Sequence, residues 1–321
     1  MHDLLRLPID ASAHGPEIDN MIVVIHWLML VLFVGWGSFF AFVLIRFRRS
    51  KNQTANHDGL QSHFSSYLEV GVAIFEAILL IGFAFPLWAK RVNQIPDEKT
   101  ATVVRVVAEQ FAWNVHYPGA DGVFGRTDIN LVSSDNPLGL DRSDPYAKDD
   151  ITTINQLNLP VEKPVVIHLS SKDVIHSFNL PLFRVKQDAI PGEVIRVWFI
   201  PTMTTDQIRI QSIQHVALKQ GNYPAVLAST SAVEDYNAKD GTPIVSKGGS
   251  ISEEIVPQLL QAGITSVVVA PDTPTEIACA QLCGLGHFRM RGFVTIQTPE
   301  EYQAWLQQQA TMLAPEPAPS N

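Results

Sequence analysis

The chain has 321 residues, of which only 17% are charged, against roughly 25% in an ordinary soluble domain. Its formal net charge is −9, and an acidic exterior repels nucleic acid and favours a basic protein partner. Two cysteines are too few for a disulfide framework, a four-cysteine zinc site or a four-cysteine iron–sulfur cluster.

Two apolar stretches near the N-terminus are long enough to cross a membrane. Residues 21–45 carry no charge and predict a helix of about 37 Å, against a hydrocarbon core of about 30 Å. Residues 67–90 form the second stretch, in which Glu69 and Glu76 are the charges before its basic end. The loop between them, 46–66, is basic, so the positive-inside rule predicts that it is cytoplasmic. The external segment 1–20 and the rest of the chain then lie outside.

From residue 97 the pattern changes to short β-branched runs separated by Pro, Gly and Asp. This pattern is typical of an all-β sandwich or barrel, expected over 97–300. The predicted strands are 102–107, 165–169, 194–200, 207–210, 266–269 and 293–296. Two polar stretches, 118–160 and 228–264, are expected to be loops or insertions. Thr298-Pro-Glu-Glu predicts a helix start, so 301–321 is expected to be a C-terminal helix followed by a disordered tail.

The densest cluster of possible metal ligands is Cys279-Ala-Gln-Leu-Cys283-Gly-Leu-Gly-His287-Phe-Arg-Met290. Thiolate, imidazole and thioether together suit copper, whereas zinc seldom uses methionine. Two thiolates can bridge two metals, and each metal then needs an imidazole, so a second histidine is expected from elsewhere. The candidates are His116, His168, His176 and His215, and His176 is favoured because a strand is predicted to end beside it. A local disulfide or two plain buried thiols are the structural alternatives.

These motifs, with Asp173-Val-Ile-His-Ser-Phe and the stretch 183–192, resemble subunit II of the haem–copper cytochrome c oxidases. The resemblance covers nearly the whole chain except 118–160 and an insertion at about 204–270. It implies a cupredoxin domain, a Greek-key β-sandwich, that carries the binuclear copper centre CuA. The resemblance implies that Cys279 and Cys283 bridge the two coppers. His176 and His287 would each bind one copper through an imidazole. Met290 and the backbone carbonyl of Gln281 would be the weak axial ligands.

The sequence departs from the family pattern in two places. Gln281 stands where the family commonly has a glutamate that helps to bind magnesium at the boundary with subunit I, so the resemblance does not carry that magnesium over to this chain. Glu109-Gln-Phe-Ala-Trp113 resembles the aromatic segment where electrons enter from cytochrome c. There Phe111 replaces the usual tryptophan and Trp113 matches the second one; core packing is the alternative explanation for both.

Glu69 matches the family glutamate at the mouth of a proton pathway into subunit I, whereas no role transfers to Glu76. A carboxylate inside a bilayer is costly and usually faces protein or water. The alternative for both residues is a buried carboxyl group that is neutral or hydrogen-bonded to a neighbouring helix.

The sequence therefore predicts an electron-transfer subunit of a terminal oxidase, anchored in a bacterial inner membrane with both termini and the copper domain outside. The resemblance implies that it takes electrons from cytochrome c or a c-haem domain. It passes them to the haems of subunit I, where oxygen is reduced to water and protons are pumped. Its expected partners are subunit I, other oxidase subunits and membrane lipid, with no nucleic acid, and the oxygen-reducing site lies outside this chain.

Two other functions remain open at this point. The same module could serve a nitric oxide reductase, since the electron relay is identical and the catalytic partner decides. A membrane protein that binds or delivers copper is the second alternative, although six scattered methionines do not form the runs that favour delivery.

Overall fold

The computed structural model describes residues 2–54, 57 and 62–313. The predicted disordered tail beyond 313 and part of the predicted 46–66 loop therefore lie outside the described residues. The chain divides into two compact units: residues 1–7 with 14–94, and residues 8–13 with 95–321.

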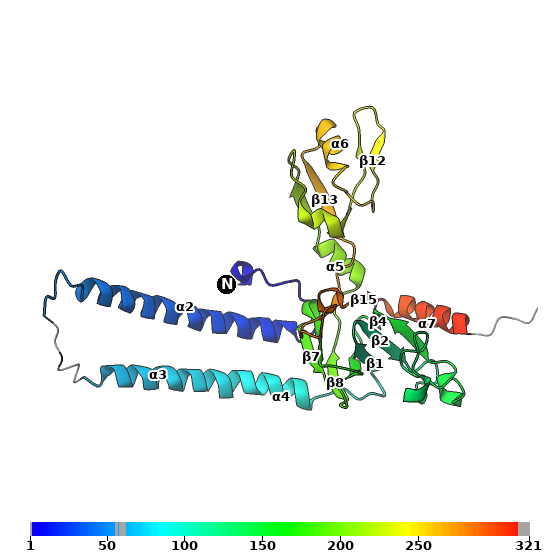
Figure 1. Cartoon of the computed structure of the whole chain (residues 1–321), viewed down its shortest axis with the longest axis horizontal. Helices are drawn as coiled ribbons and strands as arrows, with labels where there is room; N and C mark the ends of the chain where they lie inside the picture. Colours follow the sequence, from blue (N-terminus) through cyan, green and yellow to red (C-terminus); the bar gives the residue numbers. More distant parts are fainter. Residues whose placement is uncertain (1, 55–56, 58–61, 314–321) are drawn as a thin grey trace, which may run out of the picture. The chain divides into compact units, whose positions relative to one another are not determined.

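The first unit contains two long apolar helical runs (Figure 1). Its elements are α1 (His2–Leu5), α2 (Gly15–Arg46), α3 (Phe64–Leu79), a π-helical turn (Leu80–Ala84) and α4 (Phe85–Asn93). Both α2 and the continuous run Phe64–Asn93 are long and apolar enough to cross a membrane. The most apolar 18-residue segment of each helical run has no residue buried by the rest of the chain. Such a surface is available to lipid or to a partner protein.

The π-helical turn lies immediately before Pro86, which is near the start of α4. A proline has no N–H to donate to the carbonyl four residues earlier, and its ring collides with that carbonyl in a regular α-helix. The wider π turn makes room for the ring without breaking the helical run.

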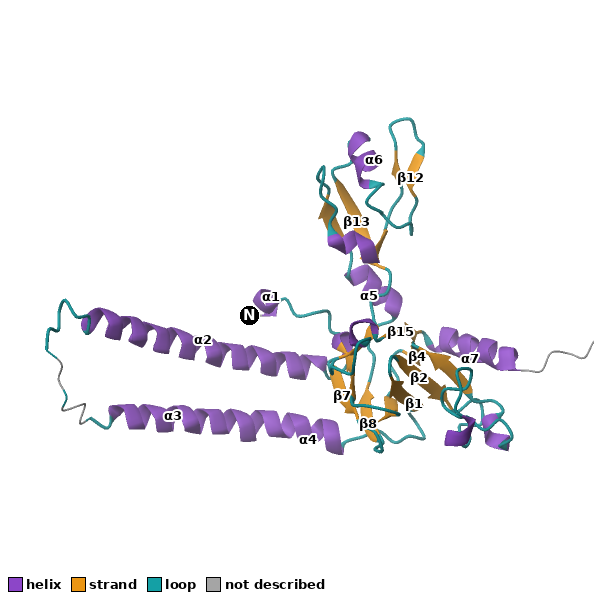
Figure 2. Cartoon of the chain, in the orientation of Figure 1, coloured by secondary structure: helices purple, strands orange, loops and turns teal. Residues whose placement is uncertain are grey.

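The second unit is built on two five-stranded sheets (Figure 2). The first has the order β3-β2-β1-β5-β8 and the second has the order β4-β15-β14-β6-β7. The first sheet's strands are β1 (Thr102–Glu109), β2 (Ala112–Tyr117), β3 (Ile151–Ile154), β5 (Val165–Ser171) and β8 (Ile195–Phe199). The second sheet's strands are β4 (Gln156–Pro160), β6 (His176–Leu180), β7 (Val185–Ala189), β14 (Glu276–Cys279) and β15 (Arg291–Gln297). Only β1–β5 and β4–β15 pair in parallel; the other neighbours in these two sheets are antiparallel.

One hydrophobic core joins the two sheets because successive side chains of a strand point to opposite faces. Along β1, Val104, Val106 and Ala108 are fully buried, while the residues between them face outward. Trp113, Leu157, Ile167, Phe178 and Ile277 from five other strands complete the same core.

The C-terminal helix α7 (Pro299–Leu313) begins where the sequence predicts a start. The Thr298 hydroxyl accepts from the backbone N–H of Glu301 at 3.2 Å, and the Glu301 carboxylate accepts from the backbone N–H of Thr298 at 2.9 Å, which is a capping box. Trp305 of this helix packs edge-on against Tyr117 of β2 at 5.0 Å between ring centroids.

Residues between β8 and β14 form an insertion with a hydrophobic core of its own. Its elements are α5 (Thr205–Gln211), β9 (Gln214–Ala217), β10 (Thr230–Ala232), β11 (Tyr236–Asn237), β12 (Pro243–Val245), α6 (Val256–Gln261) and β13 (Ser266–Pro271). The strands pair as β10-β13-β9 and β11-β12, and buried Leu227, Ile251, Leu259 and Val267 are among the core residues.

The predicted fold class, two apolar helices followed by an all-β domain with a C-terminal helix, is confirmed. Two local predictions are wrong. The predicted strand at 207–210 is part of α5, because Thr204 and Gln207 form a capping box at its start and the Gln-Ile-Arg-Ile alternation has no neighbouring strand. The polar stretch 118–160, expected to be a loop or an insertion, contains β3 and β4 of the two main sheets at its end. The polar stretch 228–264, for which the same was expected, lies in the insertion, where its few apolar residues are enough for a small core.

Candidate metal centre

Strand pairing in the second sheet brings the candidate ligands together. His176 begins β6 and Cys279 ends β14; the two strands are antiparallel, with Cys279 opposite Phe178. The start of one strand and the end of the other therefore lie at the same end of the sheet. Cys283, His287 and Met290 follow in the turn that connects β14 to β15.

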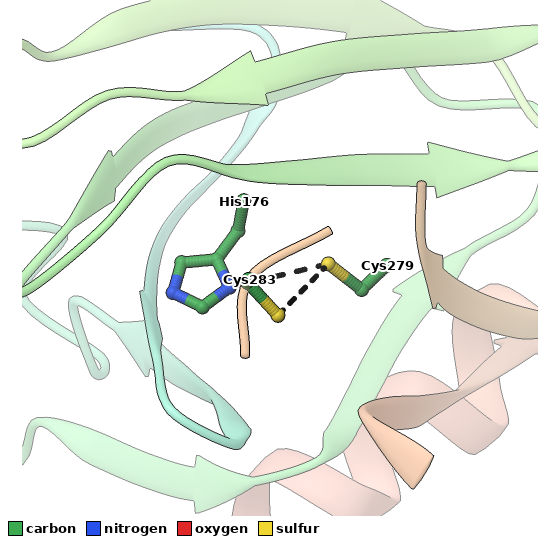
Figure 3. Close-up of side chains that lie close together, drawn as sticks. All are labelled: His176, Cys279 and Cys283. Atoms are coloured by element: carbon green, nitrogen blue, oxygen red, sulfur yellow. Dashed lines mark hydrogen bonds between the residues drawn. The ribbon is translucent and has the colours of Figure 1, made fainter. Parts of the chain in front are cut away.

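The side chains of His176, Cys279 and Cys283 converge, with one ligand atom of each within 4.8 Å of the others (Figure 3). The two sulfur atoms are 3.8 Å apart, and His176 Nδ1 lies 3.9 Å from Cys279 Sγ. On the other side, His287 Nδ1 lies 3.6 Å from Cys283 Sγ. Each thiol thus has one imidazole nitrogen beside it.

Two weaker donors complete the cluster. Met290 Sδ lies 3.8 Å from Cys283 Sγ, and the Met290 side chain is buried. The backbone carbonyl of Gln281 accepts from the Cys279 thiol at 3.3 Å, whereas the Gln281 residue as a whole is exposed. The sequence-predicted ligands are therefore all brought to one place by the fold.

The donor set fits a soft metal ion. Both cysteines are free thiols, and a sulfur separation of 3.8 Å excludes the disulfide alternative, which needs about 2.05 Å. Metal–thiolate bonds are about 2.3 Å long, so two sulfurs less than about 4.6 Å apart can share one ion. Two thiols, two imidazoles and a thioether, with no carboxylate among the donors, suit copper better than a hard cation.

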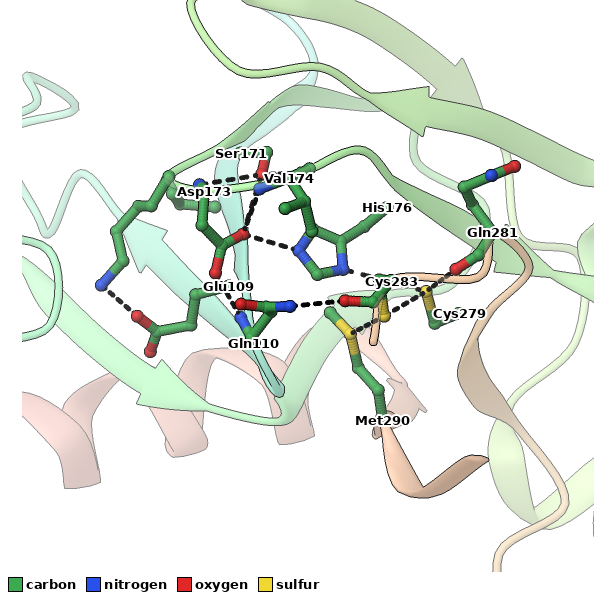
Figure 4. A network of polar contacts seen from close by, with 12 residues as sticks. Glu109, Gln110, Ser171, Asp173, Val174, His176, Cys279, Gln281, Cys283 and Met290 are labelled. Carbon is green, nitrogen blue, oxygen red and sulfur yellow. Dashed lines mark hydrogen bonds and ion pairs between the residues drawn. The ribbon is translucent and has the colours of Figure 1, made fainter. Parts of the chain in front are cut away.

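The orientation of His176 is fixed by Asp173 (Figure 4). His176 Nε2 is 2.8 Å from Asp173 Oδ1, so Nδ1 is the ring nitrogen left for the thiol side. Asp173 Oδ2 also accepts from the backbone N–H of Gln110 at 2.7 Å, and the Gln110 side-chain amide donates to the Cys283 carbonyl at 2.6 Å. Gln110 thereby links the histidine half of the cluster to the cysteine loop.

Burial and hydrogen bonding shift two pKa values here. Burial acts to raise the pKa of Asp173, but hydrogen bonds from His176 and from the backbone N–H groups of Gln110 and Val174 outweigh it and hold that pKa below its usual range. Burial, with the neighbouring Cys279 thiol, raises the pKa of Cys283 to about 11. Without a cation the Cys283 thiol is therefore protonated at neutral pH, and a bound metal ion displaces that proton.

Two aromatic residues pack against the cluster. Trp113 is completely buried and meets His176 edge-on at 6.3 Å and Phe178 at 5.6 Å between ring centroids. The half-buried Phe111 ring lies against the turn: a Cβ atom at Gly286 would be 2.4 Å from Phe111 Cδ2. Gly284 in the same turn has a φ of +133°, which only glycine adopts readily.

The other candidate residues lie elsewhere. His116 is buried against Asp150 at 2.6 Å, His168 bonds Glu98 at 2.9 Å, and His215 is exposed on β9 of the insertion. Glu69 lies exposed on α3 in the first unit.

Sequence reasoning missed the positioning roles of two residues. The role of Asp173 could have been predicted from the sequence, because this residue stands three positions before His176 in the same motif. No local signal pointed to Gln110, whose contact to Cys283 joins residues 173 positions apart.

Comparison with known proteins agrees with the resemblance in the motifs. Residues 102–208 match the family model for cytochrome c oxidase subunit II, periplasmic domain. That match includes His176 and ends before the cysteine turn, which the insertion separates from it.

Two curated proteins show the same relationship. The chain is 27% identical, over 92% of its length and 80% of the other chain, to alternative cytochrome c oxidase subunit 2 of Bradyrhizobium diazoefficiens. It is 27% identical, over 57% of its length and 65% of the other chain, to cytochrome c oxidase subunit 2 of Cereibacter sphaeroides. A crystal structure of the periplasmic domain of cytochrome oxidase subunit II from Bradyrhizobium japonicum aligns at 18% identity over 68% of this chain and 99% of that chain, with a TM-score of 0.34. The resemblance of this chain to cytochrome c oxidase subunit II is thus confirmed.

Proposed function

We propose that this chain, which is similar to cytochrome c oxidase subunit II, is the membrane-anchored electron-transfer subunit of a haem–copper terminal oxidase. One observation carries the proposal: two free thiols 3.8 Å apart, each with an imidazole nitrogen within 4 Å. We assign Cys279 and Cys283 as bridging ligands and His176 and His287 as terminal ligands of a binuclear copper centre. Met290 and the Gln281 carbonyl are its weak ligands.

When bound, a copper pair of this kind supplies a one-electron relay. The chain's own part is to keep the donors still, because an electron moves fastest between sites whose geometry changes little. His176 and Cys279 are held on paired strands, and Asp173 fixes the imidazole ring through Nε2. The buried side chains of Trp113 and Phe178 exclude water from the inner side of the cluster.

Electrons pass to and from partner proteins, and the surface beside the cluster suits protein contact. Leu282, Leu285 and Phe288 in the ligand turn are 77%, 98% and 83% exposed. Exposed apolar side chains grouped in this way indicate a protein contact. We propose subunit I as the acceptor and cytochrome c or a c-haem domain as the donor, with Phe111 and Trp113 on the path of the incoming electron.

The charges of the first unit support a two-pass topology with the copper domain outside. Arg46 ends α2, and Arg48, Arg49 and Lys51 follow it directly. At the opposite end Lys90 is paired with Glu17 at 2.5 Å, so its positive charge is balanced there. The positive-inside rule then places the loop after α2 in the cytoplasm and both termini on the periplasmic side of a bacterial inner membrane.

We propose that Glu69, exposed on α3, faces subunit I at the mouth of a proton pathway. An exposed carboxylate on a membrane-spanning helix is costly in lipid, so it is expected to face protein or water. We assign no magnesium to Gln281, because its side chain is a neutral amide.

The experiment is metal analysis of the full chain, purified in detergent and loaded with copper. Two coppers per chain, an absorption spectrum in the visible region and an electron paramagnetic resonance signal shared by two copper nuclei are expected. Cys283→Ser should abolish the shared signal, while the control His215→Gln, on the exposed β9, should leave it unchanged. One copper per chain, or a site that takes only zinc, would refute the binuclear assignment.

A second arm tests the oxidase role. Membranes that carry the assembled complex should lose donor-driven oxygen uptake with His176→Ala and keep it with His215→Gln. Copper bound normally by a chain that copurifies with no haem-bearing subunit would favour copper delivery and contradict the oxidase assignment.

A further inference from the structure

A cavity of about 450 Å³ lies on the outer face of the first sheet, away from the metal ligands. Its floor comes from β1 and β5, where Arg105, Val107, His168 and Ser170 project from the side opposite the hydrophobic core. Residues 127–138, part of the long connection between β2 and β3, form the opposite wall.

The connection is held firmly, so the cavity is preformed. Asp150 at its end accepts from His116 and from the backbone N–H of Gly125, at 2.6 and 2.8 Å, inside the protein. Arg142 donates to the carbonyls of Ala147 and Asp150 at 2.6 and 2.9 Å. Each of these bonds joins parts of the connection to one another or to the sheet.

Four basic side chains and one acidic one, Asp128, line the cavity. Asp128 accepts from the backbone N–H and the side-chain amide of Asn130 at 2.8 and 2.9 Å, and three of the basic side chains have a carboxylate partner. His116 is bonded to Asp150, His168 to Glu98 and Lys172 to Glu109.

Arg105 is the exception. Among the residues that the structure describes, its guanidinium makes no ion pair. It lies over the Phe124 ring at 4.1 Å, and it interacts electrostatically with the charge of Asp150 without forming an ion pair with it. Burial lowers the pKa of Arg105, and the nearby negative charge of Asp150 offsets only part of that effect. A half-buried guanidinium in this state is available to a ligand carboxylate or phosphate, which it can bind through two parallel hydrogen bonds.

The rim of the cavity is apolar. Ile129, Val132 and Val194 line it and are 85%, 42% and 68% exposed, so hydrocarbon side chains surround the opening above the Arg105 guanidinium. A ligand that matches both parts carries an anionic head and a hydrocarbon tail.

We propose that this cavity binds an amphiphilic anion, with its carboxylate or phosphate on Arg105 and its hydrocarbon chain on Ile129, Val132 and Val194. The head group can belong to a free fatty acid or to a phospholipid, since both offer oxygen anions attached to an apolar chain. The cavity contains none of the proposed copper ligands, although Ser171 in its lining is hydrogen-bonded to Asp173 at 3.4 Å.

The test measures dodecanoate binding to the full chain in phosphatidylcholine nanodiscs, using a ¹³C-labelled carboxylate observed by NMR. Dodecanoate also partitions into the bilayer, to the same extent for every variant. The difference between variants therefore measures binding to the protein alone. Arg105→Gln should weaken specific binding about tenfold or more, because a charge-assisted hydrogen bond is lost. Arg105→Lys should have a smaller effect, and Arg196→Gln, which removes an exposed positive charge from β8 outside the cavity, should have none.

Further arms identify the ligand. Dodecanol, which has no carboxylate, should bind far more weakly than dodecanoate. A longer hydrocarbon chain should raise the affinity of the carboxylate ligand, and Ile129→Ser should make this increase smaller. If phosphatidylglycerol in the nanodisc abolishes the Arg105-dependent difference, the resident ligand is a lipid head group; if the difference persists, it is a free amphiphile. Equal binding by the wild type and Arg105→Gln, or an equal loss with Arg196→Gln, would overturn the proposal.

Discussion

The contact between Phe111 and the ligand turn gives a sharp test of how the copper loop is shaped. Gly286 has a φ of −91° and a ψ of 7°, a conformation that any residue can adopt. Glycine is needed here for space, because an added Cβ would lie 2.4 Å from Phe111 Cδ2 and 2.7 Å from two further ring atoms. The perturbation is therefore Gly286→Ala, which adds one methyl group and no backbone strain.

The size of the effect follows from that distance. Ordinary contacts of a Cβ begin at 3.4 Å, so the ring or the turn must shift by about 1 Å. Overpacking of this kind costs about 1–3 kcal/mol. Because His287 follows Gly286 directly, the shift also displaces a proposed copper ligand, and copper affinity should fall together with stability.

The assay is denaturant unfolding of the metal-free full chain, with copper affinity measured by competition against a chelator. The double variant Gly286→Ala/Phe111→Ala should be less destabilised than the sum of its single variants by about 1 kcal/mol or more, since removing the ring removes the clash. Gly71→Ala, the same change at a helical glycine with no heavy atom within 4 Å of the new Cβ, is the control and should not destabilise. Unchanged stability in Gly286→Ala, or strictly additive effects, would refute the packing argument.

Three further outcomes are expected. Asp173→Asn replaces the carboxylate that orients His176, so copper affinity should fall about 10–100-fold in the same competition assay, and unchanged affinity would remove Asp173 from the site. Hydrogen bonds from Arg126, first, and from Ser143 lower the pKa of Asp141 to about 2, so the stability from these contacts is present above about pH 4 and is lost as the pH falls through about 2. Arg126→Gln should therefore move the Asp141 carboxyl titration, followed by ¹³C NMR, back towards pH 4; an unmoved titration would contradict the pairing. Glu69→Gln should slow oxidase turnover in the assembled complex without changing its copper content, whereas an equal slowing by Glu76→Gln would point to a general membrane effect.

Local patterns were enough to predict the all-β domain. β-Branched runs identified β1, β5, β8, β13 and β15, because buried strands of a sandwich need side chains that pack on a pleated surface. The same pattern failed at 207–210, where Thr204 and Gln207 cap a helix and no strand is available as a neighbour.

The proposed copper ligands also divide into those predicted from neighbouring residues and one brought in from a distant part of the chain. Four of them stand within twelve residues and were found from their spacing. His176 was one of four possible histidines, and its choice rested on its place in a motif. The antiparallel pairing of β6 with β14 supplies the physical reason, since it sets His176 beside Cys279 across 103 positions of sequence.

By itself, the sequence determined two helices long and apolar enough to span a membrane, the β-rich fold class and the soft donor set, because apolar run length, strand propensity and ligand chemistry are properties of neighbouring residues. Only the tertiary structure decided which histidine faces the thiols, that Gln110 bridges Asp173 and the Cys283 carbonyl, and that Arg105 has no ion pair among the described residues. These features depend on contacts between segments far apart in the chain, whose register is fixed when the two sheets bury their shared core.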